Sequence, residues 1–432
     1  MTRSGRFWVL CISVAVFMIA AESTLVTSAD AAGVRLVTKE SSLGRTPAEI
    51  IFVTFAVSPD CRHIAFAAAR GQSVVVMIDG KETKRYSNIG MSAFVFSPDS
   101  KHLAHPVTKG PSWAVALDGE GGKLYDGIAA TLTFSPDSQH LAYGARKGDK
   151  WVVVVDRQEQ GEEYDVILPD TPIFSTDGSR MAYGVQQGKK YMVVVDGSSE
   201  GKYDEITAGS LVFSPDGGHM AYVAKTGRRW SVVVDGQPGK DHTKITTPPV
   251  FSADGQRMAY SVKEARKYLL VVDGQEEEAH GEVECISFSP DGKHLGYIAK
   301  KGLKQILVVD GKQEAEFDTV KGCAVIFSPD SKHFACVARR GSKWFVVMDG
   351  KEEQEFDGVV LETLVFSPNS QHLAYVAQSD WKYFFVVNGA ESKRYDGVVR
   401  NCRPIFDSPQ HLHGLIEHRG EYLKIDIDIV PQ

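Results

Sequence analysis

Histidines recur at one fixed place in the sequence, directly after a tight turn built around Asp or Asn. The set comprises His63, His102, His140, His219, His294, His333, His372 and His411, and Arg180 and Arg257 take the equivalent place in two further copies. Imidazole binds metal ions and relays protons, so such a set could build a metal centre or an acid–base site. However, successive members are 37 to 40 residues apart, one to each repeat, and groups so spread cannot share one ion. We therefore predict a structural role for them, with no catalytic residue, no metal site and no cofactor.

Five further histidines depart from the repeat. His105 stands where most copies have tyrosine, His413 where most have alanine, and His242, His280 and His418 lie outside the periodic set. A polysaccharide lyase needs a base near a divalent metal that carboxylates or histidines hold. Nothing in the sequence brings these five together, and a carbohydrate-active enzyme such as a lyase is the alternative function.

Basic residues recur in the connection between the second and third apolar segments of each repeat. Those on which we place a binding surface are Lys147, Lys190, Arg228, Arg229, Arg266, Lys301, Arg339 and Arg340. Acidic residues follow the third segment instead, as at Glu276–Glu278. In a four-stranded antiparallel unit these two connections lie at opposite ends, so we expect one basic rim and one acidic rim. A ring of like charges attracts an anionic polymer or an acidic protein surface.

The alternative is that these basic residues are solvated loop side chains whose positive field is neutralised by nearby acidic residues. An aspartate closes the fourth segment of many repeats and reaches the same end (Asp126, Asp165, Asp204, Asp318, Asp357, Asp396). Exposed pairs of this kind contribute only about 0–1 kcal/mol each.

Aromatic residues also recur once per repeat, at the start of the third segment. They are Trp113, Trp151, Tyr191, Trp230, Tyr268, Trp344 and Tyr383. Such rings could stack on sugars, but packing between neighbouring repeats explains their regularity more simply.

The elements that must position these residues are short strands. The segment LVFSPDGGHMAY (211–222) returns as LTFSPDSQHLAY (132–143), ISFSPDGKHLGY (286–297) and LVFSPNSQHLAY (364–375). Each copy has an apolar first strand, a Ser-Pro-Asp turn, a second strand, a β-branched third strand and an Asp-Gly turn that favours a type I′ hairpin into a fourth strand. Ten copies of about 39 residues are present, the last shortened.

A four-stranded unit that repeats every 40 residues or so is a β-propeller blade. We therefore predict an all-β fold, a β-propeller of about ten four-stranded blades. The last repeat lacks a fourth strand, and Gly33–Lys39 is a spare β-like segment that could complete it against Tyr422–Val430. One spare strand and one missing strand favour one closed ring, with two smaller propellers as the alternative.

The F-S-P-D-G-K-H-L-A-Y pattern resembles the WD40-like repeat of the PD40 class, the TolB type. The resemblance covers nearly all of residues 32–432 and implies a propeller. TolB also carries an α/β domain and six blades, neither of which this sequence shows, so the resemblance implies no role in a TolB complex. Similar repeats accompany prolyl-oligopeptidase-type hydrolases, but we find no hydrolase domain beside the repeats in this sequence. Oligogalacturonate lyases also resemble this class.

The N-terminus is typical of an export signal. Arg3 and Arg6 precede the apolar run Phe7–Ala21, and Ala29-Asp30-Ala31 offers a cleavage site. We predict a signal peptide over 1–31, a propeller over 32–432, no stable membrane span after cleavage, and a periplasmic or extracellular location.

Five of the six cysteines would remain after cleavage, and none lies in a CxxC or CxxH pattern that binds zinc. Cys323 and Cys336, on successive strands of one repeat, could form a bridge, although small buried thiols are the commoner outcome. The net charge of −7 argues against generic nucleic-acid binding. Together these observations predict an exported, non-catalytic binding module for a protein or an anionic glycan, with a lyase or a structural envelope protein as alternatives.

Overall fold

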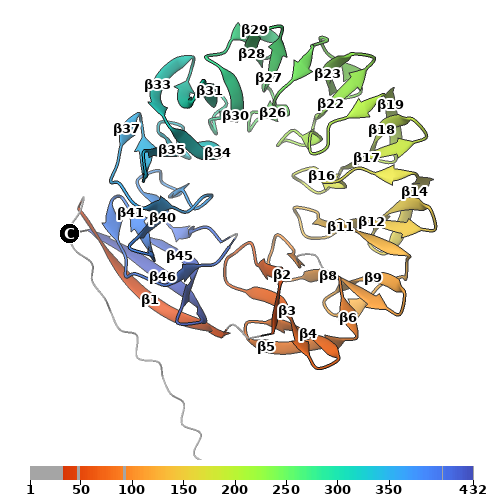
Figure 1. Ribbon diagram of the computed structural model, residues 1–432, viewed down its shortest axis with the longest axis horizontal. Coiled ribbons are helices and arrows are strands. Elements are labelled where there is room, and N and C mark those ends of the chain that lie inside the picture. Colours follow the sequence, from red (N-terminus) through yellow and green to blue (C-terminus); the bar gives the residue numbers. More distant parts are fainter. Residues whose placement is uncertain (1–32, 46–48, 91–93, 401, 432) are drawn as a thin grey trace, which may run out of the picture.

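The computed structural model describes residues 33–45, 49–90, 94–400 and 402–431, in which all regular structure is strand. The strands form ten antiparallel sheets. These sheets stand as blades around a ring, as Figure 1 shows. The prediction of a ten-bladed, all-β propeller is confirmed. The predicted signal peptide lies outside the described residues, and the structure contains no helix within them that is long and apolar enough to cross a membrane.

Each blade has four strand positions, named a to d from the centre of the ring outward, and the blades are numbered 1 to 10 along the chain. Position a holds β2 (Ile50–Val57), β6 (Asn88–Ile89) with β7 (Val95–Phe96), β11 (Gly127–Phe134), β15 (Val166–Ile167) with β16 (Ile173–Phe174), β20 (Glu205–Ile206) with β21 (Val212–Phe213), β25 (Lys244–Ile245) with β26 (Val250–Phe251), β30 (Glu282–Phe288), β34 (Thr319–Phe327), β38 (Gly358–Val359) with β39 (Val365–Phe366), and β43 (Gly397–Val398) with β44 (Ile405–Ser408). Position b holds β3 (Ile64–Arg70), β8 (Leu103–Lys109), β12 (Leu141–Lys147), β17 (Met181–Gln187), β22 (Met220–Thr226), β27 (Met258–Glu264), β31 (Leu295–Lys301), β35 (Phe334–Arg340), β40 (Leu373–Ser379) and β45 (His411–His418).

The outer half of each blade is a second hairpin. Position c holds β4 (Ser73–Ile78), β9 (Ser112–Leu117), β13 (Lys150–Val155), β18 (Lys190–Val195), β23 (Arg229–Val234), β28 (Lys267–Val272), β32 (Lys304–Val309), β36 (Lys343–Met348), β41 (Lys382–Val387) and β46 (Glu421–Pro431). Position d holds β5 (Lys81–Tyr86), β10 (Glu120–Gly121), β14 (Gln158–Tyr164), β19 (Ser198–Tyr203), β24 (Gln237–Pro238), β29 (Gln275–Glu278), β33 (Lys312–Phe317), β37 (Lys351–Glu352), β42 (Ala390–Glu391) and, in blade 10, β1 (Val34–Arg45).

The a–b turn is fixed by the side chains of the Ser-Pro-Asp sequence, as in blade 8. The Ser328 hydroxyl donates to Asp330 Oδ1 at 2.6 Å, and it accepts the backbone N–H of His333 at 3.0 Å. Ser331 adopts a φ of +62°, in the left-handed region that glycine fills in other copies. The turn therefore satisfies its own backbone and delivers strand b in register.

Strand β1 closes the ring. It pairs with β46 from Val34 opposite Pro431 to Arg45 opposite Glu421, so the first described strand completes the last blade. The spare segment predicted over Gly33–Lys39 has this role and extends further, to Arg45.

The core lies between the blades. Ten buried apolar clusters each join two neighbours around the ring, and one of them joins blade 10 to blade 1, where Phe66 and Met77 pack with Leu415 and Tyr422. Since every neighbouring pair shares a core, the blades form one closed ring, and the alternative of two smaller propellers is wrong. A blade can bury its faces only against its neighbours.

Candidate functional site

All of the repeating histidines except His372, which contacts the Asn388 amide, hold a carboxylate of their own blade. His63 Nδ1 lies 2.7 Å from Asp79 Oδ2, and the other oxygen of Asp79 accepts the backbone N–H of Ile64 at 2.9 Å. The same arrangement joins His102 to Asp118, His140 to Asp156, His219 to Asp235, His294 to Asp310 and His333 to Asp349, while Arg180 and Arg257 hold Asp196 and Asp273. These pairs tie the start of strand b to the c–d turn, in keeping with a structural role. Within the described residues no group of three or more ligands could hold a metal ion.

The five other histidines do not come together. His105 lies on β8 in blade 2, His242 and His280 follow strands d of blades 5 and 6, and His413 and His418 lie on β45. His413 is a residue of the ring seam, because its Nδ1 lies 2.6 Å from Asp407 and its Nε2 lies 2.7 Å from the carbonyl oxygen of Asp60 in blade 1.

Aspartates neutralise much of the b–c hairpin end of the ring. The Lys304 ammonium donates to Asp318 Oδ1 at 2.5 Å, and Asp318 Oδ2 accepts the backbone N–H of Gly341 in the next blade at 2.7 Å. The same contact with a lysine joins Lys150 to Asp165, Lys190 to Asp204, Lys343 to Asp357 and Lys382 to Asp396. The hydrogen bonds from Lys304 and Gly341 lower the pKa of Asp318. Each aspartate therefore hydrogen-bonds to the b–c hairpins of two neighbouring blades and neutralises the charge of one lysine. We call this arrangement the clasp.

The predicted basic residues divide into three groups at this end. Four are engaged by acids: Lys147 with Glu159 and Glu163, Lys190 with Asp204, Arg229 with Glu264, and Arg340 with Glu352. Arg339 lies over the Trp344 ring, 5.5 Å from its centroid. In the part of the chain that the structure describes, no carboxylate pairs with the remaining three, Arg228, Arg266 and Lys301.

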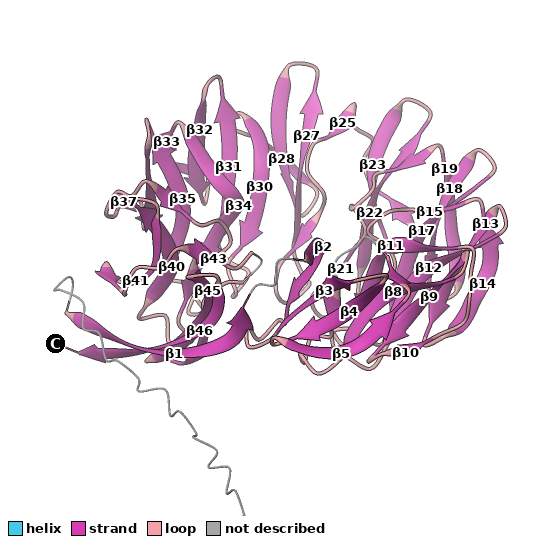
Figure 2. Ribbon diagram, turned by 60° about the horizontal axis from the view of Figure 1, so that its bottom comes forward, coloured by secondary structure: helices cyan, strands magenta, loops and turns pink. Residues whose placement is uncertain are grey.

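These three residues and Lys189 form what we call the basic arc. All four are exposed, and they lie on the b–c hairpins of blades 4, 5, 6 and 7, which are consecutive in the ring. Figure 2 shows the hairpin that joins β27 to β28 at one edge of the ring. Two hairpin tips are apolar: Leu303, on the same hairpin as Lys301, is 95% exposed, and Trp381, on the β40–β41 hairpin of blade 9, is 86% exposed.

A hollow of about 550 Å³ lies beside the basic arc, between blades 5 and 6. Its lining consists of Thr207, Trp230, Thr243, Lys244, Ile245, Lys263 and Ala265. Trp230 is half-buried, with the Lys225 ammonium 5.1 Å from its ring centroid. The Tyr268 hydroxyl, 3.1 Å from the Lys263 ammonium, raises the pKa of that lysine. The hollow thus combines a flat aromatic face with two cations and hydroxyls.

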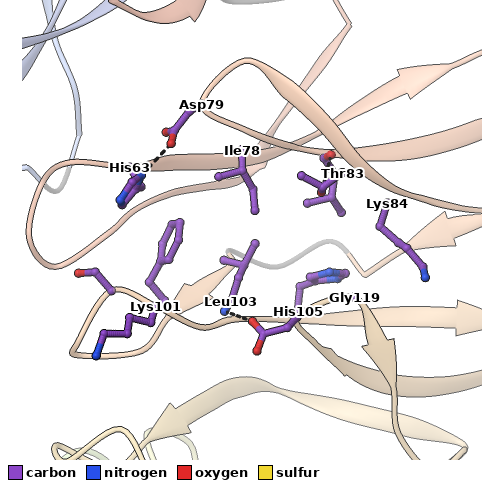
Figure 3. A pocket seen from close by; sticks show the side chains of 13 residues that line it. His63, Ile78, Asp79, Thr83, Lys84, Lys101, Leu103, His105 and Gly119 are labelled. Atoms are coloured by element: carbon purple, nitrogen blue, oxygen red, sulfur yellow. Dashed lines mark hydrogen bonds and ion pairs between the residues drawn. The ribbon is translucent and has the colours of Figure 1, made fainter. Parts of the chain in front are cut away.

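A second hollow, of about 590 Å³, lies between blades 1 and 2 at the other end of the blades. Figure 3 shows His63, Asp79 and Ile78 on one side of it and Lys101, Leu103 and His105 on the other. The corresponding hollow between blades 2 and 3 has only about 270 Å³. Tyr143 and Arg157 line that smaller space at the positions that His105 and Gly119 take here.

His105 is the unusual residue of this second hollow. It is 1% exposed, it stacks on Phe94 with 4.6 Å between ring centroids, and its Nδ1 has no hydrogen-bond partner among the described residues. Burial lowers its pKa to about 4. The imidazole is therefore neutral at physiological pH.

The ten-bladed ring makes this chain a β-propeller. No model of a known family matches its sequence, and no curated protein matches it. Solved structures with a similar fold include TolB from Acinetobacter baumannii (18% identity, 50% of this chain and 64% of that one, TM-score 0.28) and the Cps50 (Swd1) β-propeller domain of Myceliophteria thermophila (12%, 59% and 96%, 0.31). The crystal structure of a eukaryotic initiation factor has 12% identity over 70% of this chain and 87% of its own, with a TM-score of 0.46. At these identities the likeness is one of fold alone.

Proposed function

We propose that this chain is a non-catalytic binding module that recognises an anionic glycan through the b–c hairpin end of blades 4 to 7. One observation carries the proposal: the four cations of the basic arc lie on consecutive blades and have no carboxylate partner in the described structure. The lysines that begin strand c in blades 3, 4, 7, 8 and 9 are instead each paired with an aspartate. Unpaired charges on neighbouring hairpins add their fields, and a polyanion lying along the rim could contact several of them.

The hollow beside Trp230 favours a glycan over an acidic protein surface. An aromatic face supplies a large, rigid contact area for a flat ring, and Lys244 and Lys263 can meet carboxylates or sulfates on the same sugar. Its volume of about 550 Å³ suits one or two sugar units rather than the surface of a protein. Of the eight basic residues predicted from the sequence, the proposal keeps the three that have no carboxylate partner and no aromatic contact in the described structure, which are Arg228, Arg266 and Lys301. It adds Lys189.

Two further parts of the proposal come from the sequence. The F-S-P-D-G-type repeats favour the WD40-like, TolB-type class of propeller, and the apolar run after Arg6 favours export to the periplasm or the medium. In that location an extracellular polysaccharide is an accessible ligand.

The test is retention of the full-length chain on immobilised polygalacturonate at low and at physiological salt. We expect retention at low salt and weakening as the Debye length falls to about 8 Å. The variant K189S/R228S/R266S/K301S should lose retention. The matched control K150S/K190S/K304S/K343S removes the same number of charges from paired positions and should weaken retention far less than the first variant does.

Each other outcome has a defined meaning. Equal loss in both variants would show that only mean charge matters and would overturn the basic arc. No retention at low salt would reject the glycan and direct the search to an acidic protein. Depolymerisation of the polygalacturonate during the assay would identify a lyase.

A further inference from the structure

Two cysteines meet where the ring closes. Cys61 lies in the a–b turn of blade 1, where other copies have serine or glycine, and its φ of +48° matches that turn. Cys402 lies between β43 and β44 in blade 10. Their Sγ atoms are 2.6 Å apart although 341 residues separate them in the chain. The ring itself brings them together, because blades 1 and 10 are neighbours only after closure.

The surroundings hold both sulfur atoms in place. The backbone N–H of Leu415 points to Cys402 Sγ at 3.3 Å, and Cys61 Sγ lies 3.5 Å from the carbonyl oxygen of Arg403. Cys61 is 2% exposed, whereas Cys402 is partly exposed. Both line a hollow of about 770 Å³ that also has Arg400 and Arg403 in its wall. A small disulfide reagent can therefore approach Cys402 first.

We propose that Cys61 and Cys402 form a disulfide that closes the ring covalently. The oxidant is a low-molecular-weight or protein disulfide, of the class that export compartments supply. The Cys402 thiolate attacks one sulfur of the oxidant, and one thiol leaves. The Cys61 thiolate then attacks Cys402 Sγ in the mixed disulfide, and the second thiol leaves. The two cysteines lose two electrons and two protons, and the oxidant disulfide is reduced to two thiols.

The bond would fix the seam at a second place. The pairing of β1 with β46 holds the outer edge of blade 10, while Cys61 and Cys402 lie near the inner strands of blades 1 and 10. The cross-link would span 341 residues, and long loops lose the most chain entropy in the unfolded state. The bond therefore opposes the opening of the ring rather than the unfolding of any single blade.

Peptide mapping of the full-length chain tests the bond. The protein is equilibrated in a mixture of oxidised and reduced glutathione, free thiols are blocked with iodoacetamide, and tryptic peptides are mapped without reduction. We expect a linked pair of peptides containing Cys61 and Cys402, which separates with dithiothreitol. Recovery of both cysteines in alkylated form from the oxidised sample would overturn the proposal, as would stable linkage of either one to another cysteine.

A thermal comparison provides the second measurement. Oxidation should raise the melting temperature of the wild type and of the control C336A by several degrees, and leave that of C61S and C402S unchanged. An equal rise in C402S would contradict the proposed pair. Neither readout involves a glycan, so the outcome is independent of the proposed ligand.

Discussion

The ammonium of Lys304 lies 2.5 Å from Oδ1 of Asp318, at the boundary between blades 7 and 8. The second oxygen of this carboxylate accepts the backbone N–H of Gly341, so one aspartate joins the b–c hairpins of two blades. The same clasp recurs around the ring and pairs most of the lysines that begin strand c with an aspartate. It leaves the hairpin tips as the places where positive charge is available to a ligand.

Replacing Asp318 with asparagine should lower the melting temperature slightly, because the clasp loses its charge but keeps its shape. The hydrogen bonds from Lys304 and Gly341 lower the pKa of Asp318, so its contribution to stability is present above the ordinary carboxyl range and is lost as the pH falls through the lowered value. The difference between wild type and D318N should therefore be full at pH 7 and shrink below about pH 4. Melting curves across this range test it, with the hairpin variant D149N as control. A constant difference at all pH values would contradict the clasp.

Replacing Trp230 with alanine should weaken binding of polygalacturonate about tenfold, since the flat face of the hollow is lost. Trp113 occupies the equivalent place in blade 2, away from the basic arc, and W113A should bind like the wild type. Titration of each variant with the soluble polymer, after circular dichroism has shown an intact fold, gives the ratio. Equal affinities for W230A and the wild type would exclude the hollow from the site.

Replacing His105 with phenylalanine should remove a pH dependence of stability. Burial lowers the pKa of His105 from 6.5 to about 4 in the folded state, so the unfolded chain binds the extra proton between these values and the wild type loses stability as the pH falls through them. The expected loss is about 3 kcal/mol, present in the wild type and absent in H105F. Urea unfolding midpoints at pH 7.5 and pH 4.5 measure it. Parallel shifts in both proteins would show that His105 does not remain neutral.

Replacing Phe345 with alanine should cost about 3–5 kcal/mol, because this ring is fully buried between blades 7 and 8 against Phe317. Leu303, on the b–c hairpin just before β32, is 95% exposed, and L303S should change stability by less than about 0.5 kcal/mol. Urea unfolding at pH 7.5 compares the two. A small effect of F345A would mean that neighbouring blades do not depend on each other.

Local features of the fold were predictable because each is encoded within one repeat. The Ser328 turn and the Asp-Gly hairpins follow from such short patterns. The role of the spare strand β1 was predictable for another reason, the count of strands over the whole chain. The candidate site was only partly predictable. The sequence left open whether aspartates such as Asp318 neutralise the basic hairpins. Only the geometry shows which cations these aspartates contact.

Two features were not predicted from the sequence. Cys61 and Cys402 are 341 residues apart and occupy different positions in their copies, so no periodicity links them. Trp381 takes a tip position that is polar in most blades, and a residue-by-residue comparison of hairpin tips would have found it.

The pairing of β1 with β46 also sets an order of events during synthesis. Blades 1 to 9 are each built from one continuous stretch of chain, so they can assemble one after another as the chain lengthens. Blade 10 joins the first described strand to the last, and it must wait until everything between them has been made. Until then β1 is an unsatisfied strand edge, and the growing chain must keep it from pairing with a strand of another molecule.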